Sequence, residues 1–366
     1  MGLKNPNWTK GFLTLDVRFF EDQLKYIAKK FTCISLKEYW QIQNGELKSP
    51  KNPIVLTFDD GYLDNWQYAY PLLKKYGLKG TIFVSPEFAD LRNGVRPNLE
   101  DVWKDNATMN ELKTWGFLSW DEMRMMEKSG VIDIQSHTMS HTKYFVSDKL
   151  IGFHRPDADS LYYIGNKQID RKPYYISDPE FEKLLPFGYP IFEMESAVVA
   201  RKLDINQEFI NHCVETLANY NYSNYSFDDS FARVKGKYDE LKTSNRLITS
   251  IETEEEYNRR LRYEIFESKR IIEENLNKKV EFLCWPHGDN NEFAHKLAME
   301  AGYLATTVGS KEKILEKPDR IPERIGLFHS RNNRLLSILK ARYKIGFFLE
   351  KFPWIQIKRI YSLLKN

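Results

Sequence analysis

Apolar positions along the chain follow two alternating patterns. Short, nearly continuous apolar runs are typical of strands that are buried on both faces. Such runs occupy residues 54–58, 80–84, 131–135, 280–284 and 304–308. The stretches between them carry apolar residues at helical spacing. These stretches predict helices over residues 19–30, 65–76, 121–129, 254–275 and 292–301. Strand and helix units of this length predict parallel strands with helices outside, and therefore an α/β fold.

This alternation is interrupted between residues 148 and 250, where the chain becomes aromatic and polar. Helices are expected there at residues 195–203 and 207–220. An interruption of about 100 residues is longer than an ordinary loop. We therefore expect a barrel-like catalytic domain from residues 1–147 and 251–330, with residues 148–250 inserted as a lid or a satellite subdomain.

The last 36 residues of the chain break its charge balance. Residues 331–366 hold nine Lys or Arg against one acid, Glu350, while the rest of the chain carries a net charge of −5. After Pro353, which suits a first helical position, apolar and aromatic residues recur at helical spacing. A basic amphipathic tail of this kind can lie on an anionic membrane surface. It can equally be a terminal helix packed on the domain with a solvated basic face, and both interpretations stay open.

Composition narrows the class of protein. The 366 residues are 42% hydrophobic and 29% charged, so the chain can bury a sizeable core. A net charge of only +3 argues against a dedicated nucleic-acid binder. The three cysteines contain no CxxC pair, and we expect reduced thiols. Neither a secretory signal nor a long apolar span is evident, which predicts a cytoplasmic protein. Any contact with the membrane would then be made by the tail.

Aromatic residues make up 14% of the chain, which is unusually many. The tyrosines gather in the insertion. They can line a sugar-binding surface, or they can fill the core of a small subdomain. Composition does not choose between these two uses.

Two polar clusters follow predicted strands, where α/β folds place their active sites. Asp59 and Asp60 come directly after the first strand, and Gly61 could kink the chain so that both carboxylates reach one site. His137 and His141 follow the strand at 131–135. If this segment coils into a helical turn, the two imidazoles can converge on one cation. Two histidines and one aspartate would leave a coordination position open for water and substrate.

A third cluster follows the strand at 280–284. Its residues are Cys284, Trp285, Pro286, His287 and Gly288. The backbone N–H groups of His287 and Gly288 could bind an oxyanion, and Trp285 could stack on a sugar or simply pack. Taken alone, this segment indicates little.

The residues at 57–62 and 136–141 resemble the first two motifs of the polysaccharide deacetylases (carbohydrate esterase family 4, the NodB-homology domain). Residues 285–288 are similar to that family's third motif. The resemblance covers roughly residues 11–147 and 251–330. It implies a distorted (β/α) barrel with about seven strands, here interrupted by the insertion. It also implies hydrolysis of an N-acetyl group, or less often an O-acetyl group, on a hexosamine or polysaccharide.

The resemblance also implies a role for each motif residue. Asp59 would be the catalytic base, and Asp60, His137 and His141 would bind a divalent metal, with Zn²⁺ as the expected ion. The substrate, a carbohydrate that can be lipid-linked, would contact four further residues. These are Tyr62, Trp285, Pro286 and Gly288.

Two departures from the family pattern matter. In many members an arginine opens the third motif and orients the base, but Cys284 stands at that position. The motif tyrosine is replaced by His287, although its role as a backbone N–H donor could survive. The general acid is commonly a late Leu-x-His histidine, which here is His329. His287 competes with His329 for that role.

Three functions remain after this reasoning. The favoured one is a metal-dependent carbohydrate N-deacetylase. A metal-dependent amidohydrolase acting on a small non-sugar amide would use the same residues, because the chemistry does not depend on what carries the acyl group. A glycan-binding protein with a degenerate site is disfavoured because the base and all three ligands are present.

Overall fold

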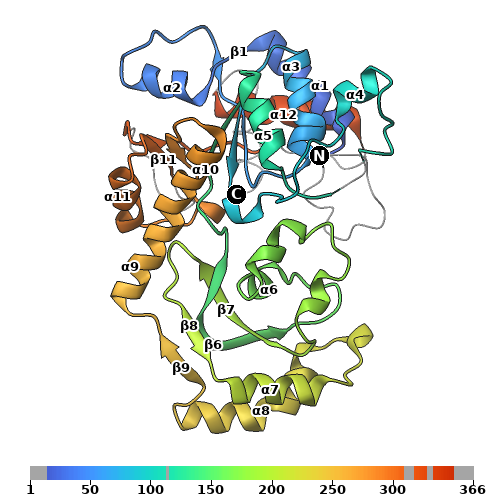
Figure 1. The fold of residues 1–366 in the computed structure, drawn as a ribbon, viewed down its shortest axis with the longest axis vertical. Helices are drawn as coiled ribbons and strands as arrows, with labels where there is room; N and C mark the ends of the chain where they lie inside the picture. The colour runs from blue at the N-terminus through green and yellow to red at the C-terminus, as the bar shows by residue number, and fades with distance from the viewer. Residues whose placement is uncertain (1–14, 113–114, 309–316, 328–332, 350–366) are drawn as a thin grey trace, which may run out of the picture.

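The predicted parallel strands form one sheet in the upper half of the molecule (Figure 1). The computed structural model describes residues 15–112, 115–308, 317–327 and 333–349. Within them, six parallel strands pair in the order β12, β11, β10, β5, β4, β3. Their bounds are β3 (Thr57–Phe58), β4 (Gly80–Val84), β5 (Ile132–Ser136), β10 (Phe282–Leu283), β11 (Ala305–Thr307) and β12 (Arg320–Ile321).

The sheet curls until its two edges face each other. Arg324, just after edge strand β12, contacts Asp59, just after edge strand β3. The expected distorted barrel is therefore confirmed. The apolar run at 54–58 does not form a single strand. Its first part is β2 (Pro53–Ile54), which pairs with β1 (Thr32–Cys33) in a separate parallel pair, and only its end belongs to the barrel sheet as β3.

Helices cover the outside of the sheet, as the pattern predicted. They are α1 (Val17–Lys30), α2 (Leu36–Gln43), α3 (Tyr70–Lys75), α4 (Leu99–Trp103), α5 (Trp120–Lys128), α9 (Glu254–Arg262), α10 (Ser268–Leu276), α11 (Glu292–Glu300) and α12 (Arg334–Phe348). Two π-helical turns precede α3 and α10, namely η2 (Asn65–Ala69) and η7 (Tyr263–Glu267). The long helix expected over 254–275 is thus α9, η7 and α10 in succession, and it runs from the insertion up to the barrel (Figure 1).

The insertion has a fold and a core of its own in the lower half of Figure 1. Strand β6 (Lys143–Phe153) pairs antiparallel with β7 (Pro190–Ser196), and β8 (Leu203–Ile205) pairs with β9 (Ile248–Ile251). Its helices are α6 (Leu161–Gly165), α7 (Gln207–Leu217) and α8 (Phe227–Thr243), with short 3-10 turns η4 (Ile169–Tyr174), η5 (Phe181–Leu184) and η6 (Tyr222–Asn224). Its buried side chains form a hydrophobic cluster separate from that of the barrel.

One helix expected in the insertion is wrong. The first two residues of the stretch 195–203 belong to β7. The backbone N–H groups of Val199 and Ala200 then donate to the carbonyl of Ser196 in a tight turn, and β8 begins at Leu203. Pairing with β6 overrides the local helical spacing. The helix expected at 207–220 is confirmed as α7.

The described part of the tail packs on the first helix. Ser337, Ala341 and Ile345 of α12 are buried, and Arg334 pairs with Asp22 of α1 at 2.5 Å. For residues 334–348 the structure therefore matches the packed-helix alternative. The helix predicted after Pro353 lies outside the described residues. Among the helices that are described, none is long and apolar enough to cross a bilayer.

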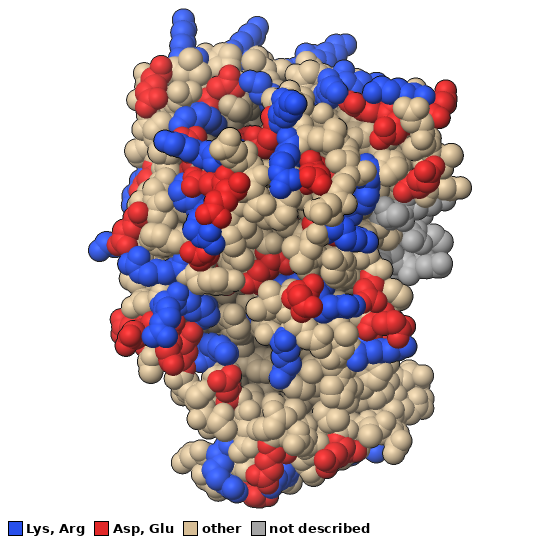
Figure 2. Space-filling view, viewed as in Figure 1, with Lys and Arg blue, Asp and Glu red and all other residues tan. Residues whose placement is uncertain are grey.

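Positive and negative side chains are intermingled over the face shown in Figure 2. They do not gather into a large patch of one sign on that face. The surface thus agrees with the near-neutral charge of the sequence.

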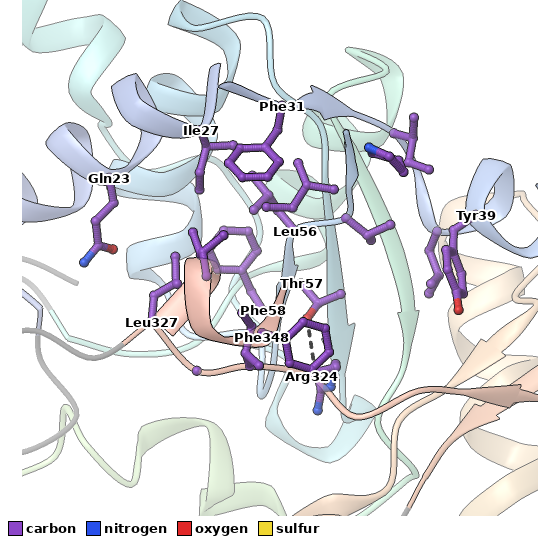
Figure 3. A pocket seen from close by; sticks show the side chains of 18 of the residues that line it. Gln23, Ile27, Phe31, Tyr39, Leu56, Thr57, Phe58, Arg324, Leu327 and Phe348 are labelled. Atoms are coloured by element: carbon purple, nitrogen blue, oxygen red, sulfur yellow. Dashed lines mark hydrogen bonds between the residues drawn. The ribbon is translucent and has the colours of Figure 1, made fainter. Parts of the chain in front are cut away.

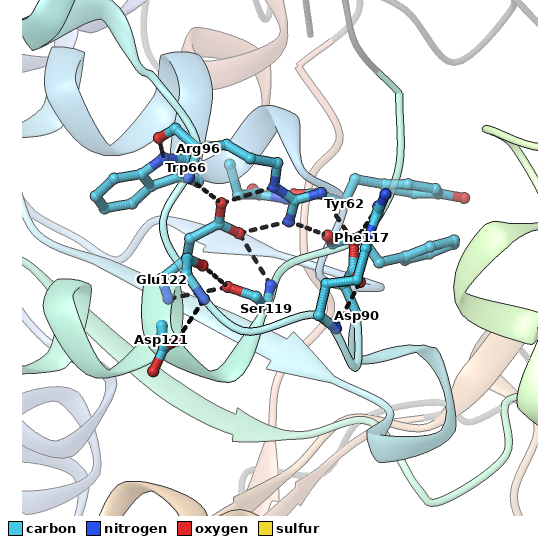
Figure 4. A network of polar contacts seen from close by, with 11 residues as sticks. Tyr62, Trp66, Asp90, Arg96, Phe117, Ser119, Asp121 and Glu122 are labelled. Carbon is cyan, nitrogen blue, oxygen red and sulfur yellow. Dashed lines mark hydrogen bonds and ion pairs between the residues drawn. The ribbon is translucent and has the colours of Figure 1, made fainter.

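A buried polar network holds the segment between β4 and α5 beside the sheet (Figure 4). The Arg96 guanidinium donates to Glu122 at 2.6 and 2.8 Å and to Asp90 at 3.1 Å. It also donates to the carbonyl oxygen of Phe117 at 2.6 Å. The side chains of Glu122 and Asp90 are 0% and 2% exposed. Arg96 therefore neutralises two carboxylates that water does not reach, and it fixes the backbone at Phe117.

Replacing Arg96 by Met should lower the free energy of unfolding by roughly 3–5 kcal/mol, because buried Glu122 would lose its cation and buried Asp90 would lose one of its two. Arg92→Met is the matched control. Arg92 pairs with the same Asp90, but its side chain is 62% exposed, so the loss should stay below about 1 kcal/mol. Urea denaturation followed by circular dichroism measures both. Equal, small losses would contradict the role given to Arg96.

Candidate metal and catalytic site

The carboxylate of Asp60 is aimed by a reversal of the chain directly after β3. Asp60 and Gly61 both adopt left-handed backbone conformations, with φ of 72° and 68°. A Cβ on Gly61 would lie 3.0 Å from Cγ1 of Val84, so this turn also requires a residue without a side chain. The expected kink at Gly61 therefore begins one residue earlier, at Asp60. A non-glycine residue in this conformation is uncommon and is characteristic of functional sites.

The two histidines lie on an irregular loop after β5 rather than on the helical turn that the sequence suggested. Thr138 and His141 have φ of 63° and 42°. These two left-handed residues fold the loop back, so that the rings of His137 and His141 lie 5.0 Å apart. The convergence expected from the spacing is present, although the local conformation that produces it is different.

The three predicted metal ligands meet at one point. Nε2 of His137 and Nε2 of His141 each lie 3.2 Å from Oδ1 of Asp60. Ligand atoms about 2.0–2.1 Å from a tetrahedral zinc would lie roughly 3.3 Å apart, so this donor set fits a cation of that size. Among the described residues these three form one of two groups that could hold a metal ion.

Electrostatics at the three ligands favour a bound cation. Burial alone would raise the pKa of the Asp60 carboxyl, but His141 and His137 hold it well below its usual range. Burial alone would lower the pKa of His137, but Cys284 and Asp60 raise it well above its usual range. The cluster thus attracts positive charge, which protons or a metal ion can supply.

Partners outside the ligand set orient it. Nδ1 of His137 lies 2.8 Å from the carbonyl oxygen of Cys284, which leaves Nε2 free to bind a metal. Glu264, from the π-helical turn η7, accepts from the backbone N–H groups of Met139 and Ser140 at 3.2 and 3.0 Å. Glu264 is 1% exposed, and it lies inside the helix that leads into the third motif. A buried carboxylate therefore holds the loop between the two histidines.

Asp59 also lies near His137, with a carboxylate oxygen within 4.8 Å of a ring nitrogen, and it is held by an arginine that sequence reasoning missed. Arg324, from the chain after β12, donates to Oδ1 and Oδ2 of Asp59 at 2.7 and 2.8 Å. It also donates to Sγ of Cys284 at 3.0 Å. The side chain of Asp59 is 35% exposed, so it stays open to water. The support that the departure at Cys284 put in doubt thus comes from the last strand of the sheet.

No local signal could have identified Arg324. It is 265 residues from Asp59 along the chain, and it follows the two-residue edge strand β12. The unusual Cys284 was the available hint, because a small side chain there leaves room for a guanidinium from elsewhere.

The third motif contributes less to the open site than expected. Trp285 is 1% exposed and Pro286 is buried, so both pack in the barrel instead of contacting a sugar. This corrects the substrate-binding role given to them. The N–H of Gly288 donates to the carbonyl of Trp285 at 3.1 Å and is therefore already engaged within the turn.

His287 is the residue of this motif that faces the metal ligands. It is exposed, adopts a left-handed conformation with φ of 59°, and its ring lies 4.8 Å from that of His141. Loss of hydration at this imidazole, together with the charges of His141 and Lys143, lowers the pKa of His287 to about 3. His287 is therefore neutral at pH 7. The competing candidate for the general acid, His329, lies outside the described residues.

Tyr62 belongs to the wall of the site. Its ring is half-buried and stacks on Phe117 with a centroid distance of 5.0 Å. Phe117 in turn packs on Phe88, whose ring lies 6.2 Å from that of His141. The Arg96 network thus reaches the site through Phe117.

An apolar cavity of about 520 Å³ lies between the edge strands β3 and β12. It is lined mainly by side chains of α1, the β2–β3 segment, residues 321–327 and α12. Figure 3 shows Ile27, Phe58 and Phe348 around it, with Arg324 bonded to Thr57. The open side of the barrel is therefore apolar, and the guanidinium that holds Asp59 lies at its border.

Comparison with known proteins agrees with this site. Residues 46–170 match the family model described as polysaccharide deacetylase. YxkH of Bacillus subtilis (strain 168), provisionally named as a polysaccharide deacetylase, is 31% identical over 123 residues. Those residues cover 33% of this chain and 36% of YxkH, so the match spans about a third of that relative.

One solved structure supports the same fold, and a second is less similar. A de-N-acetylase from Aggregatibacter actinomycetemcomitans aligns over 88% of this chain and 87% of its own, with a TM-score of 0.50 and 17% identity. The BpsB deacetylase domain from Bordetella bronchiseptica aligns over 87% of both chains, with a TM-score of 0.47 and 18% identity. Residues 46–170, which match the polysaccharide deacetylase model, contain the first two motifs of the sequence.

Arg324→Met should lower kcat by on the order of a hundredfold, because an unrestrained Asp59 would leave its productive orientation. Metal content should be unchanged, since Arg324 contacts none of the three ligands. Arg324→Lys should recover only part of the activity, because an ammonium cannot donate to both carboxylate oxygens in the same planar manner. Wild-type kcat in the Met variant would show that Asp59 needs no such support.

Proposed function

We propose that this chain is a metal-dependent hydrolase that removes an N-acetyl group from a hexosamine in a glycan, an oligosaccharide or a lipid-linked sugar. One observation carries the proposal. His137 and His141 each lie 3.2 Å from Asp60, while Arg324 holds Asp59, which has a carboxylate oxygen within 4.8 Å of a ring nitrogen of His137. A structural ion pair would not need a second, separately oriented carboxylate beside three metal ligands.

Each residue has a distinct task in this proposal. Asp60, His137 and His141 would hold a divalent cation, with Zn²⁺ as the expected ion. When bound, such a cation polarises an acyl carbonyl and lowers the pKa of a water. Asp59 is the general base that takes a proton from the attacking water, since a carboxylate paired with Arg324 keeps further lone pairs for this proton.

The negative charge that develops on the acyl oxygen requires a hydrogen-bond donor, and the backbone N–H of His287 is the candidate. The backbone of His287 is left-handed, with φ of 59°, and the neighbouring N–H of Gly288 already donates to the carbonyl of Trp285. We assign the His287 N–H to the developing oxyanion. This role uses the backbone, so it survives the replacement of the family's tyrosine by histidine.

The leaving amine must receive a proton. A group with a pKa of about 3 carries almost none at pH 7, so the His287 imidazole is a poor source. We therefore propose His329 as the general acid.

A small non-sugar amide remains the second candidate substrate, because the acyl chemistry would be the same. The stacked rings of Tyr62 and Phe117 beside the ligands favour a sugar, since aromatic faces suit the apolar faces of pyranose rings. The alternative of a degenerate glycan-binding protein is disfavoured by the complete and oriented set of four residues.

Asp59→Asn should reduce acetate release by on the order of a thousandfold or more while metal content stays at the wild-type level. Asp60→Ala should lose the metal as well as the activity. Acetate release from soluble and polyprenyl-linked N-acetylhexosamines and from a small acetamide measures turnover, and elemental analysis measures the metal.

In the same assay, His329→Ala should lose far more activity on amides than on p-nitrophenyl acetate, whose leaving group needs no proton.

Unchanged turnover in Asp59→Asn would refute the assignment of the base. Turnover of the acetamide alone would replace the carbohydrate substrate with a small amide. If the protein binds glycan but releases no acetate, only the hypothesis of a glycan-binding protein with a degenerate site would remain.

We also propose a cytoplasmic enzyme that touches the inner face of the membrane through its tail. Support comes from Leu335, Leu336 and Leu339 of α12, which are 76%, 42% and 50% exposed beside the basic residues of the same helix. Exposed apolar side chains next to basic ones suit an anionic interface.

The full chain should therefore float with vesicles that contain anionic lipid. Leu335→Ser/Leu339→Ser and a chain ending at residue 349 should each float less, because each loses apolar side chains. Vesicles of neutral lipid are the control. Equal flotation of all three proteins would remove the membrane contact.

A further inference from the structure

The insertion reaches the metal site through α6. The hydroxyl of Tyr162 lies 3.4 Å from Nε2 of His287, and the two rings are 5.9 Å apart. His287 in turn contacts the metal ligand His141. One residue therefore separates the insertion from the ligand set, and Figure 1 shows α6 on the side of the insertion nearest the barrel.

Two more side chains of the insertion lie beside Tyr162. Asp159 is exposed and accepts a hydrogen bond from the hydroxyl of Tyr175 at 2.7 Å. We call Asp159, Tyr162 and Tyr175 the insertion wall. Burial is the main cause that raises the pKa of Tyr62, and the nearby Asp60, Tyr162 and Asp159 raise this pKa further. Tyr62, on the barrel side, thus lies within electrostatic reach of the insertion wall.

The insertion wall is held firmly against the barrel. Lys172, from η4, is 2% exposed and pairs with Glu87 of the barrel at 2.5 Å. Its ammonium also donates to the carbonyl oxygen of Ser140 at 3.0 Å, between the two ligand histidines. A Cβ on Gly165, at the end of α6, would lie 3.0 Å from the Lys172 side chain, so α6 packs directly on this lysine.

A second connection joins the same helix to the loop after His141. Asn166 accepts from the hydroxyl of Thr142 at 2.5 Å and donates to the carbonyl of Lys143 at 2.7 Å. Removing either partner of the Lys172–Glu87 pair would leave the other as a buried, unpaired charge, which is strongly unfavourable. The position of Tyr162 relative to the ligands is therefore fixed by buried contacts rather than by a surface loop.

We propose that the insertion wall binds a neutral sugar unit adjacent to the one that is deacetylated. Tyrosine rings and hydroxyls together with one carboxylate match the apolar faces and the hydroxyl groups of a pyranose. The ammonium of Lys143 lies 5.3 Å from the Tyr162 ring, so the surroundings of the wall carry a positive as well as a negative charge. This inference rests on the proposed function, since it concerns how the same site chooses its substrate.

The test compares the kcat/KM for N-acetylglucosamine with that for tetra-N-acetylchitotetraose. In the wild type the tetrasaccharide should be preferred. Asp159→Ala should lower this preference about tenfold, with the loss in KM rather than kcat, because a hydrogen bond to the added unit is removed. Asp170→Ala, which removes another exposed carboxylate of the insertion, is the matched control and should keep the preference.

Tyr162→Ala and Tyr162→Phe divide the contribution of the ring from that of the hydroxyl. The Ala variant should lose the preference, and the Phe variant should keep most of it. A wild type that does not prefer the tetrasaccharide, or a preference unchanged in both Asp159→Ala and Tyr162→Ala, would overturn the inference while leaving the deacetylase intact. Absence of acetate release by the wild type from both of these substrates and from the polyprenyl-linked N-acetylhexosamines would instead overturn the proposed function, and this inference with it.

Discussion

The meeting of Asp60 with His137 and His141 is the constraint on which the rest of the site depends. The three side chains come from the ends of β3 and β5, which are separated by β4 in a parallel sheet. Because the carboxyl ends of parallel strands share one edge, the two segments start on the same side of the barrel. Left-handed residues then turn the two segments toward each other. They are Asp60 in the first segment and Thr138 and His141 in the second.

Such strained loops persist only if their surroundings hold them. Here the surroundings are buried charges. Glu264 binds the backbone between the two histidines, and Lys172, paired with Glu87, binds the carbonyl of Ser140 in the same loop. One of these comes from the barrel's own helix and the other from the insertion. The insertion therefore contributes to the geometry of the ligands as well as to one side of the site.

The pairing of Arg324 with Asp59 shows how the barrel tolerates a departure from the family pattern. Cys284 is small enough to leave space beside Asp59, and the curl of the sheet brings β12 across to β3. A guanidinium can then approach from the opposite edge and still make two hydrogen bonds to the carboxylate. The orientation of the carboxylate is retained although its partner comes from a different strand.

Local pattern in the sequence was enough for the α/β fold and for most of the helices, and it brought forward Asp59, Asp60, His137 and His141 as candidate site residues, because burial periodicity and motif spacing are local properties. Local pattern failed where pairing with a distant segment decides the secondary structure. The ends of the helix expected at 195–203 belong to β7 and β8, and the run at 54–58 is divided between two sheets. Trp285 was expected at a sugar and is buried, because its position after β10 turns it into the core. Arg324, Glu264 and Tyr162 take their places beside the site only when segments more than a hundred residues from their partners are brought together by the curled sheet and the docked insertion. The chain's own order of residues thus determined which chemistry is available, and only the tertiary structure decided which side chains orient it.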